Sequence, residues 1–500
     1  MPVRQGHQMS EAPIAKTSLG KLRGTVENNV CVFRAVPYAA PPLGELRFAA
    51  PAPAQPWSEA RDATQHGPVP GQPLSRLRAA MGDFEREQGE DCLTLTITTP
   101  AVDGAKRPVM LWLHGGAFWT GAGSLDWYSG KSLTQHGDVV VVGVNHRLGA
   151  LGFMHLEGVS PPNLGLYDQL AALDWVVREI EAFGGDPNNI TVAGQSAGAF
   201  TILAMLANPQ ARTKFRRAIV QSAPFGRTVR SIAAAQAIGE AIQAGVGATS
   251  LEKWRSVPIE TILQTQLTVA RTLGGFCETT PPFIPVSDRQ LLGDNLMGTA
   301  AVGALDCDVI VGYTRDEMGA FFANDEKING ANDEDIRSVF ARFFGADAQG
   351  AMQEYRQRAL SLSARHLLGE LMGDASFGLG AHQFAQRLSD LGRPAWVYRF
   401  DWAAPSNVFG ACHCIELPFM FDTLPAWNAP MLAGGDPQDM SALASQMRDA
   451  WLAFMRHGDP NHPNLPSWDR YQGRRETMLF DQHSRLALDP AGIDTWKYWP

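Results

Sequence analysis

The stretch NITVAGQSAGAFTILAMLA, residues 189–207, decides the fold. Its first residues are β-branched and apolar, which predicts a buried strand, and its second half predicts an apolar helix. The two are joined by GQSAG, residues 194–198, which fits the pattern G-x-S-x-G. In so tight a turn, a side chain at Gly194 or Gly198 would collide with the neighbouring strand or helix. The turn therefore lifts the Ser196 hydroxyl above the sheet at a helix N-terminus, as in a nucleophile elbow.

The pentapeptide has little specificity by itself. With about one residue in ten being Gly, roughly 0.3 matches are expected by chance in a chain of this length. The strand before it and the helix after it supply the specificity that the five letters lack. The alternative interpretation is that Ser196 is an ordinary helix N-cap.

Short apolar runs alternate with helical patterns along the chain. Residues 165–183 carry apolar side chains at helical spacing and end at Gly184 and Gly185, which suit a helix C-cap. Strands too apolar to have a wet face belong to a sheet that is covered on both sides. The alternation predicts an α/β fold with a mostly parallel central sheet flanked by helices. Further strands are predicted at residues 109–114, 138–145, 217–221, 308–312 and 395–399.

Two stretches interrupt this alternation. Residues 65–90 are rich in Gly, Pro and charge, and residues 323–391 are helical by composition with no strand pattern. Insertions of this kind often cover an active-site mouth. Without repeats or a linker, the chain is interpreted as a single domain over residues 1–500, with these two insertions shaping the mouth.

Composition excludes several classes of protein. The 500 residues carry 42 Lys and Arg against 51 Asp and Glu, a net charge of −9, so no basic surplus favours nucleic acid. The longest apolar run, residues 139–144, is far shorter than a membrane span. The N-terminus lacks the apolar core of a signal peptide, and six cysteines are too sparse for a disulfide framework. These features predict a cytoplasmic protein without a membrane span.

A second glycine-containing loop predicts hydrogen-bond donors for a reacting oxygen. HGGAF, residues 114–118, directly follows the predicted strand at 109–114. Glycines let successive backbone N–H groups point into one cavity. We expect the N–H groups of Gly116, Ala117 and Ala197 to form an oxyanion hole, with His114 positioning the loop. A plain turn after a strand is the alternative.

Several longer motifs, in order along nearly the whole chain, carry a family resemblance. The chain resembles the type-B carboxylesterase/lipase family, the α/β-hydrolases that include cholinesterases and bacterial p-nitrobenzyl esterases. The resemblance implies an α/β-hydrolase fold with helical insertions over the active site, and a triad in the chain order Ser, acid, His. The motifs are FRAVPYAAPPLGELRF (33–48), EDCLTLTI (90–97), HGGAFWTG (114–121), NLGLYDQLAALDWV (163–176) and HGDPNHPNLPSWDRY (457–471).

The acid is expected just past a later strand, where DVIVGYTRDEMGAFF (308–322) supplies two carboxylates. The family pattern, a Gly followed shortly by D-E-G, implies Glu317 as the acid and leaves Asp316 as the alternative. Met318 stands where the family usually has Gly, so we expect it to narrow the pocket. Ser222 resembles a family serine that contacts the acid.

The base has to be chosen among 12 histidines. His413 lies in GACHCIEL (410–417), which matches the family's G-A-x-H-x-x-E-L motif. It also completes the order Ser, acid, His, whereas His382 sits on a helical pattern and is expected at the surface. Cys412 and Cys414 flank His413, but no second Cys/His pair at zinc spacing exists in the sequence, so no metal site is predicted.

These residues predict a serine carboxylesterase that needs no cofactor. Ser196 would attack, His413 would take its proton, and Glu317 would orient the imidazole. The expected partner is a small ester with a short- to medium-chain or aryl group, and an amide, lactone or carbamate is the alternative substrate. A non-catalytic scaffold protein is the alternative from another class. Residues that flank the motifs predict an apolar pocket, with core packing as the alternative: Phe118, Phe200, Phe276, Met318 and Phe321.

Overall fold

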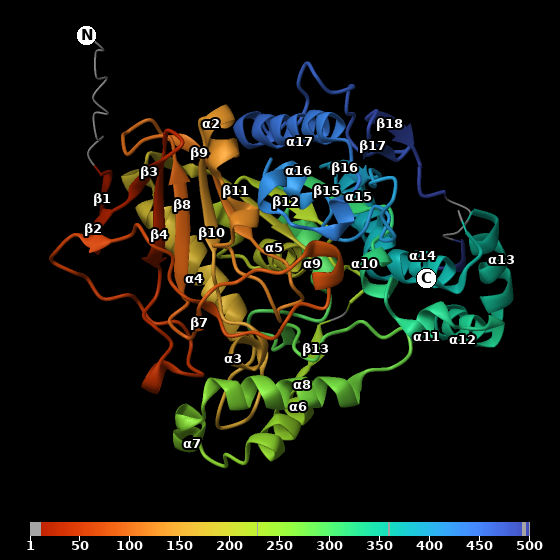
Figure 1. The fold of residues 1–500 in the computed structure, drawn as a ribbon, viewed down its shortest axis with the longest axis horizontal. Coiled ribbons are helices and arrows are strands. Elements are labelled where there is room, and N and C mark those ends of the chain that lie inside the picture. Colours follow the sequence, from red (N-terminus) through yellow and green to blue (C-terminus); the bar gives the residue numbers. More distant parts are fainter. Residues whose placement is uncertain (1–11, 228, 359–360, 493–496, 500) are drawn as a thin grey trace, which may run out of the picture.

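A large mixed sheet lies at the centre of the computed structural model, which describes residues 12–227, 229–358, 361–492 and 497–499 (Figure 1). Within these residues, eleven strands are hydrogen-bonded in a single sheet. In spatial order they are β18 (Arg485–Leu488), β17 (Glu476–Phe480), β16 (Trp396–Phe400), β15 (Asp308–Thr314), β12 (Arg217–Gln221), β11 (Gly185–Gln195), β9 (Arg107–Leu113), β10 (Val140–Val144), β8 (Thr94–Thr99), β4 (Val30–Pro37) and β3 (Thr25–Glu27).

The middle of the sheet is parallel, as the sequence predicts. Every neighbouring pair from β17 through β10 runs parallel. At the two edges, β8, β4, β3 and β18 pair antiparallel with their neighbours. All six predicted strands are present with boundaries shifted by up to four residues, and β11 lies between β9 and β12. The α/β fold class is therefore confirmed.

Helices cover both faces of the sheet, because alternate residues of its strands are apolar on each side. In β11, Ile190 and Val192 belong to one apolar cluster and Ala193 to the other. The first cluster is covered by α4 (Leu164–Glu179), α5 (Ala197–Ala207), α9 (Leu296–Gly303) and α15 (Leu379–Asp390). The second is covered by α2 (Lys131–Gly137), α16 (Leu417–Met420) and α17 (Pro437–His457).

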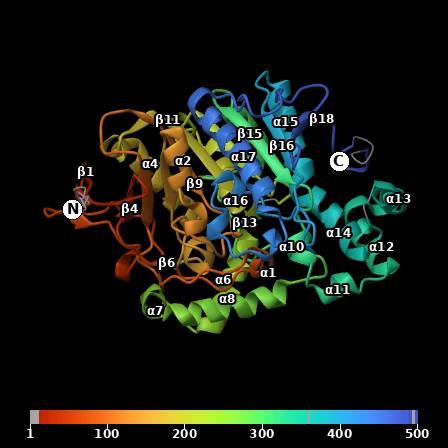
Figure 2. The same ribbon diagram turned by 45° about the horizontal axis from the view of Figure 1, so that its top comes forward.

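Two further groups of helices lie outside this sandwich and can be followed in both views (Figures 1 and 2). The green group consists of α6 (Ile232–Val246), α7 (Leu251–Ser256) and α8 (Ile259–Leu273), which share an apolar cluster with α3 (Gly149–Phe153). The teal group shares another cluster and consists of α10 (Gly319–Phe322), α11 (Glu326–Asn329), α12 (Asp333–Phe344), α13 (Ala348–Arg358) and α14 (Ala364–Gly373). Among the helices that the structure describes, none combines the length and hydropathy that crossing a lipid bilayer requires.

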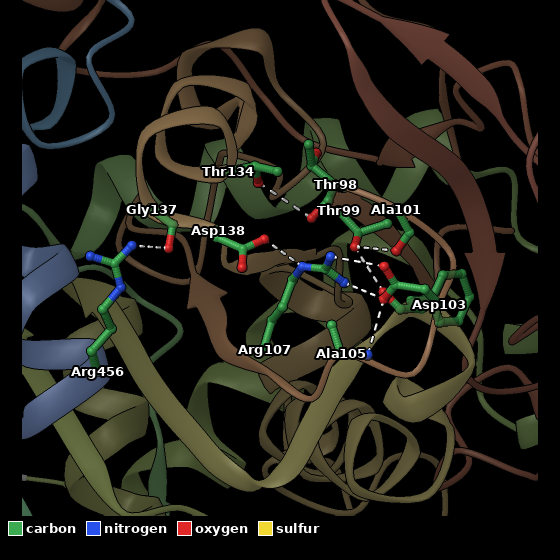
Figure 3. A network of polar contacts seen from close by, with 11 residues as sticks. Thr98, Thr99, Ala101, Asp103, Ala105, Arg107, Thr134, Gly137, Asp138 and Arg456 are labelled. Carbon is green, nitrogen blue, oxygen red and sulfur yellow. Dashed lines mark hydrogen bonds and ion pairs between the residues drawn. The ribbon is translucent and has the colours of Figure 1, made fainter. Parts of the chain in front are cut away.

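A buried arginine, Arg107, lies at the amino end of β9 and contacts two aspartates (Figure 3). The glycine loop at residues 114–118 follows the opposite end of this strand. The Arg107 guanidinium donates to Asp138 Oδ1 at 2.6 Å and to both carboxylate oxygens of Asp103 at 2.5 and 3.0 Å. The Asp103 hydrogen bonds and the nearby charge of Asp138 raise the pKa of Arg107, although burial opposes the shift. This network therefore joins the loop before β9 and the loop before β10 to the first residue of β9.

Replacing Arg107 by Leu removes these hydrogen bonds and is expected to lower the free energy of unfolding by about 1–2 kcal/mol. The loss stays this small because water can solvate both carboxylates, which are exposed. Denaturant unfolding measures the change. Arg23→Leu is the matched control, because the Arg23–Asp62 pair is exposed on both sides and its loss should cost under about 0.5 kcal/mol. Equal losses in the two variants would contradict the assigned role of Arg107.

Candidate active site

The turn between β11 and α5 holds Ser196 in an uncommon backbone conformation. Its φ and ψ are 55° and −117°, and its N–H donates to the carbonyl of Gln221 at 2.9 Å. A Cβ at Gly198 would lie 1.9 Å from the carbonyl oxygen of Leu113, and one at Gly194 would lie 2.8 Å from the same atom. The steric reason given for both glycines therefore holds in the structure, and positive φ at a non-Gly residue is typical of functional turns.

Gly198→Ala is expected to destabilise the protein by about 3 kcal/mol, because the new Cβ meets the backbone of β9 rather than a movable side chain. The shift of the turn should also lower kcat by about a hundredfold. Calorimetry and ester turnover measure the two effects. Gly293→Ala, where a Cβ meets no atom within 4 Å, is the control. A Gly198→Ala enzyme with unchanged kcat would contradict the steric argument.

His413 and Glu317 form a buried pair. His413 Nδ1 donates to Glu317 Oε2 at 2.5 Å, and each residue is 2% exposed. Glu317 Oε1 accepts two more hydrogen bonds, from the Ser222 hydroxyl at 2.6 Å and from the Thr314 N–H at 2.9 Å. The carboxylate is therefore held by three donors, and it orients the imidazole with its Nε2 free of the proton.

The alternative acid, Asp316, faces other partners. Its carboxylate accepts from the Ala411 N–H at 2.8 Å and pairs with Arg315 at 2.9 Å. Asp316 therefore joins the loop after β15 to the loop that carries His413. The glutamate is the carboxylate that contacts the imidazole.

Aromatic rings enclose the imidazole of His413. Phe321 and Phe377 lie with ring centroids 5.5 and 4.8 Å from it, and Phe377 comes from a π-helical turn, Asp374–Gly378. The Gln195 side-chain amide donates to His413 Nε2 at 3.1 Å. Among the described residues, Ser196 makes no hydrogen bond to His413, and the two side chains meet as walls of one cavity.

Glu416, three residues after His413, is buried without an ion-pair partner among the described residues. Burial, reinforced by the charge of Glu317, raises the pKa of Glu416 to about 8. Its carboxyl is therefore mostly protonated at neutral pH, and Glu317 is the carboxylate that contacts the imidazole.

Backbone N–H groups converge beside Ser196. Gly116 has φ 115° and Ala117 has φ 59°, and within the described chain the N–H groups of Gly116, Ala117 and Ala197 donate to no protein acceptor. The loop is held in this shape by the N–H groups of Trp119 and Thr120, which both donate to the Gly116 carbonyl. Gly116 and Ala117 line one cavity together with Ser196, and Ala117 and Ala197 line a second one with it.

Two cavities open beside Ser196. The larger, of about 330 Å³, is also lined by Gln195, His413 and Trp119, and it is bordered by α8 and by residues 74–84. The smaller cavity has a volume of about 40 Å³, and His413 is not part of its wall. Its walls are Arg76, Ala117, Phe118, Ser196, Ala197, Phe200, Pro224, Arg227, Pro281, Ile284, Pro285, Phe321 and Phe377.

The predicted apolar pocket residues divide among three places. Phe118, Phe200 and Phe321 line the smaller cavity. Phe276 lines a separate surface cavity, and Met318 is 1% exposed within the cluster of α10–α14. The Met318 side chain therefore packs away from Ser196 and does not narrow the pocket.

Two further histidines, His114 and His382, are structural. His114 is buried, donates from Nδ1 to the Gly115 carbonyl at 2.7 Å and stacks on His146. The expectation that His382 lies at the surface is wrong: it is fully buried on the inner side of α15, with its ring nitrogens 2.9 and 3.2 Å from the hydroxyls of Tyr313 and Tyr471. Burial lowers the pKa of both histidines to about 3.

Several wall residues were missed by the sequence analysis. Arg76 and Arg227 carry no motif, and α8 lies outside both predicted insertions, although its apolar residues repeat at helical spacing. Gln195 belongs to the predicted elbow, but no sequence signal indicated its contact with His413. Cys412 and Cys414 are buried and unpaired, and Cys412 contacts the sulfur of Met431.

Comparison with known proteins gives consistent matches. The model of the carboxylesterase family matches residues 11–490. The chain is 36% identical to phenmedipham hydrolase of Pseudarthrobacter oxydans over 97% of this chain and 99% of that one. It is 34% identical to para-nitrobenzyl esterase of Bacillus subtilis, over 97% and 98%. The solved structure of carboxylesterase EST55 of Geobacillus stearothermophilus superposes with a TM-score of 0.86 at 34% identity, over 97% and 100%.

Proposed function

Because the chain belongs to the carboxylesterase family and is a carboxylic ester hydrolase, we propose that it works through an acyl-enzyme on Ser196. Glu317 and His413 complete the triad, and the substrates are short- to medium-chain or aryl esters. The hydrogen bond between His413 Nδ1 and Glu317 Oε2, at the wall of the cavity that Ser196 also lines, carries this proposal.

In the first half of the reaction, Ser196 Oγ attacks the ester carbonyl carbon and His413 Nε2 takes the hydroxyl proton. The Ser196 hydroxyl must replace the Gln195 amide at Nε2 for this transfer, since Nε2 accepts from that amide in the structure. Glu317 stabilises the imidazolium that forms, and the N–H groups of Gly116, Ala117 and Ala197 bind the oxyanion.

The second half reverses these roles. His413 gives its proton to the leaving alkoxide, so the carbon–oxygen bond of the ester breaks and an alcohol departs. Water then attacks the acyl carbon and passes a proton to the same imidazole. The imidazolium gives that proton to Ser196 Oγ as the bond between Oγ and the acyl carbon breaks, so the acid departs and Ser196 is restored. Every proton is accounted for by one histidine, and no cofactor is required.

A fluorophosphonate probe tests the nucleophile directly. We expect one probe per molecule, attached at Ser196 and located by peptide mass spectrometry, and no labelling after denaturation. A panel of nitrophenyl esters and matching nitroanilides then separates ester from amide hydrolysis, with esters expected to turn over faster. Labelling at another residue, or none in a protein that hydrolyses the esters, would contradict the proposal.

A further inference from the structure

Two arginines line the smaller cavity beside Ser196. Arg76 comes from the loop before α1 (Arg78–Met81) and is exposed at the mouth, while Arg227 follows β12 and is half-buried. Within the described residues, neither guanidinium has a carboxylate partner within 4 Å. No acidic side chain contributes to the walls of this cavity as the described residues form it. The cavity therefore presents positive charge without a matching negative one.

Thr279 holds both guanidiniums in place. Arg227 donates to the Thr279 carbonyl at 3.0 Å and to its hydroxyl at 2.8 Å, and Arg76 donates to the same carbonyl at 3.0 Å. A guanidinium has five N–H groups, so these bonds leave donors on both side chains for a further acceptor. The bond to a shared carbonyl also fixes the two positive groups near each other.

Electrostatics favour an anion between them. Burial, with the charge of Arg76 as a second cause, lowers the pKa of Arg227 to about 10, so the group stays protonated at neutral pH. The acid that interacts with both is Glu278, which is exposed and lines the larger cavity instead. Neither guanidinium is in contact with the Glu278 carboxylate, so each can bind a carboxylate of the substrate through paired hydrogen bonds.

The two cavities can be assigned to the two halves of an ester. In the proposed mechanism, His413 protonates the leaving alkoxide, so the alcohol portion occupies the larger cavity, where His413 forms part of the wall. The acyl portion then occupies the smaller cavity, which has Ala117 and Ala197 but lacks His413. Its remaining walls, such as Phe118 and Ile284, are apolar and suit methylene groups.

We propose that this enzyme prefers esters whose acyl group ends in a carboxylate, namely monoesters of short dicarboxylic acids. Arg76 and Arg227 bind the free carboxylate while Ser196 attacks the ester carbonyl at the other end of the acyl chain. This inference rests on the proposed function of Ser196, and it adds the charge and the length class of the acyl group.

A purely structural role for the arginines makes a different prediction. Arg227 also fastens the loop at Thr279, and Arg230 fastens the same loop through the carbonyl of Pro281 at 3.2 Å without lining the smaller cavity. If Arg227 and Arg230 only stabilised this loop, replacing either one by Gln would lower kcat/KM for all esters by the same factor. Charge recognition instead changes the preference between an anionic ester and its neutral counterpart.

The experiment compares kcat/KM for monoethyl glutarate with that for its neutral amide counterpart, monoethyl glutaramate, by titration of released acid. We expect the wild type to prefer the anionic ester by about tenfold to a hundredfold. Arg227→Gln and Arg76→Gln should each remove most of that preference, and Arg230→Gln should keep it. Arg76 is exposed, so Arg76→Gln should fold normally and tests the same preference if Arg227→Gln lowers stability.

Equal rates on the two substrates by the wild type, or an equal loss of preference in Arg230→Gln, would overturn the inference. Hydrolysis of the neutral ester, and its loss in Ser196→Ala, reports on the proposed function separately. An enzyme that hydrolyses the neutral ester through Ser196 without preferring the anion would therefore retain its proposed function and lose only this acyl specificity.

Discussion

Ser196→Ala is expected to lower kcat on a nitrophenyl ester by about 10⁶, because the proposed acyl-enzyme forms on the hydroxyl that Ala lacks. The variant should fold normally, since the Ser196 side chain makes no hydrogen bond within the described residues and Ala is smaller. Pre-steady-state kinetics should show a burst of nitrophenol for the wild type and none for the variant.

The control is Ser287→Ala, which removes another buried serine hydroxyl, one that donates to Asp294 at 2.6 Å outside both cavities. It should retain kcat within about threefold while losing some stability. Turnover by Ser196→Ala within a hundredfold of the wild type would exclude Ser196 as the nucleophile, whatever the control shows.

Glu317→Gln is expected to lower kcat by about 10⁴. A Gln side chain has almost the same shape, but its amide offers N–H groups as well as an oxygen to the three donors that now face Glu317. Turning the amide to satisfy Ser222 and Thr314 presents N–H to His413, which favours the imidazole tautomer that cannot accept the Ser196 proton. Turnover under saturating ester measures the effect.

Asp316→Asn tests the neighbouring carboxylate. Its amide oxygen can still accept from the Ala411 N–H, so kcat should stay within about threefold of the wild type. A larger loss in Asp316→Asn than in Glu317→Gln would transfer the role of the acid to Asp316. The two variants therefore show which of the adjacent residues Asp316 and Glu317 is the acid, which their position after β15 alone does not decide.

The six strands were predictable because each is a short, almost wholly apolar run, and a buried parallel sheet needs such runs. The elbow was predictable for a steric reason, since Gly198 lies against the backbone of β9 and tolerates no side chain. Helix α8 was not predicted although its pattern is amphipathic, because it lies outside the alternation of strands and helices that indicates the central sheet. His382 was misplaced because a helical pattern alone does not show which of its faces meets a sheet.

Local sequence thus determined the class of fold, the turn that carries Ser196 and the glycine loop beside it, because steric limits and apolar periodicity act over a few residues. Only the tertiary structure decided that Arg76 and Arg227 share a wall of the smaller cavity, that Met318 packs among α10–α14, and that Gln195 contacts His413. The first and third placements join residues more than a hundred positions apart, and Met318 packs on helices that extend to residue 373. Side-chain charge or bulk at one position carries no record of such neighbours.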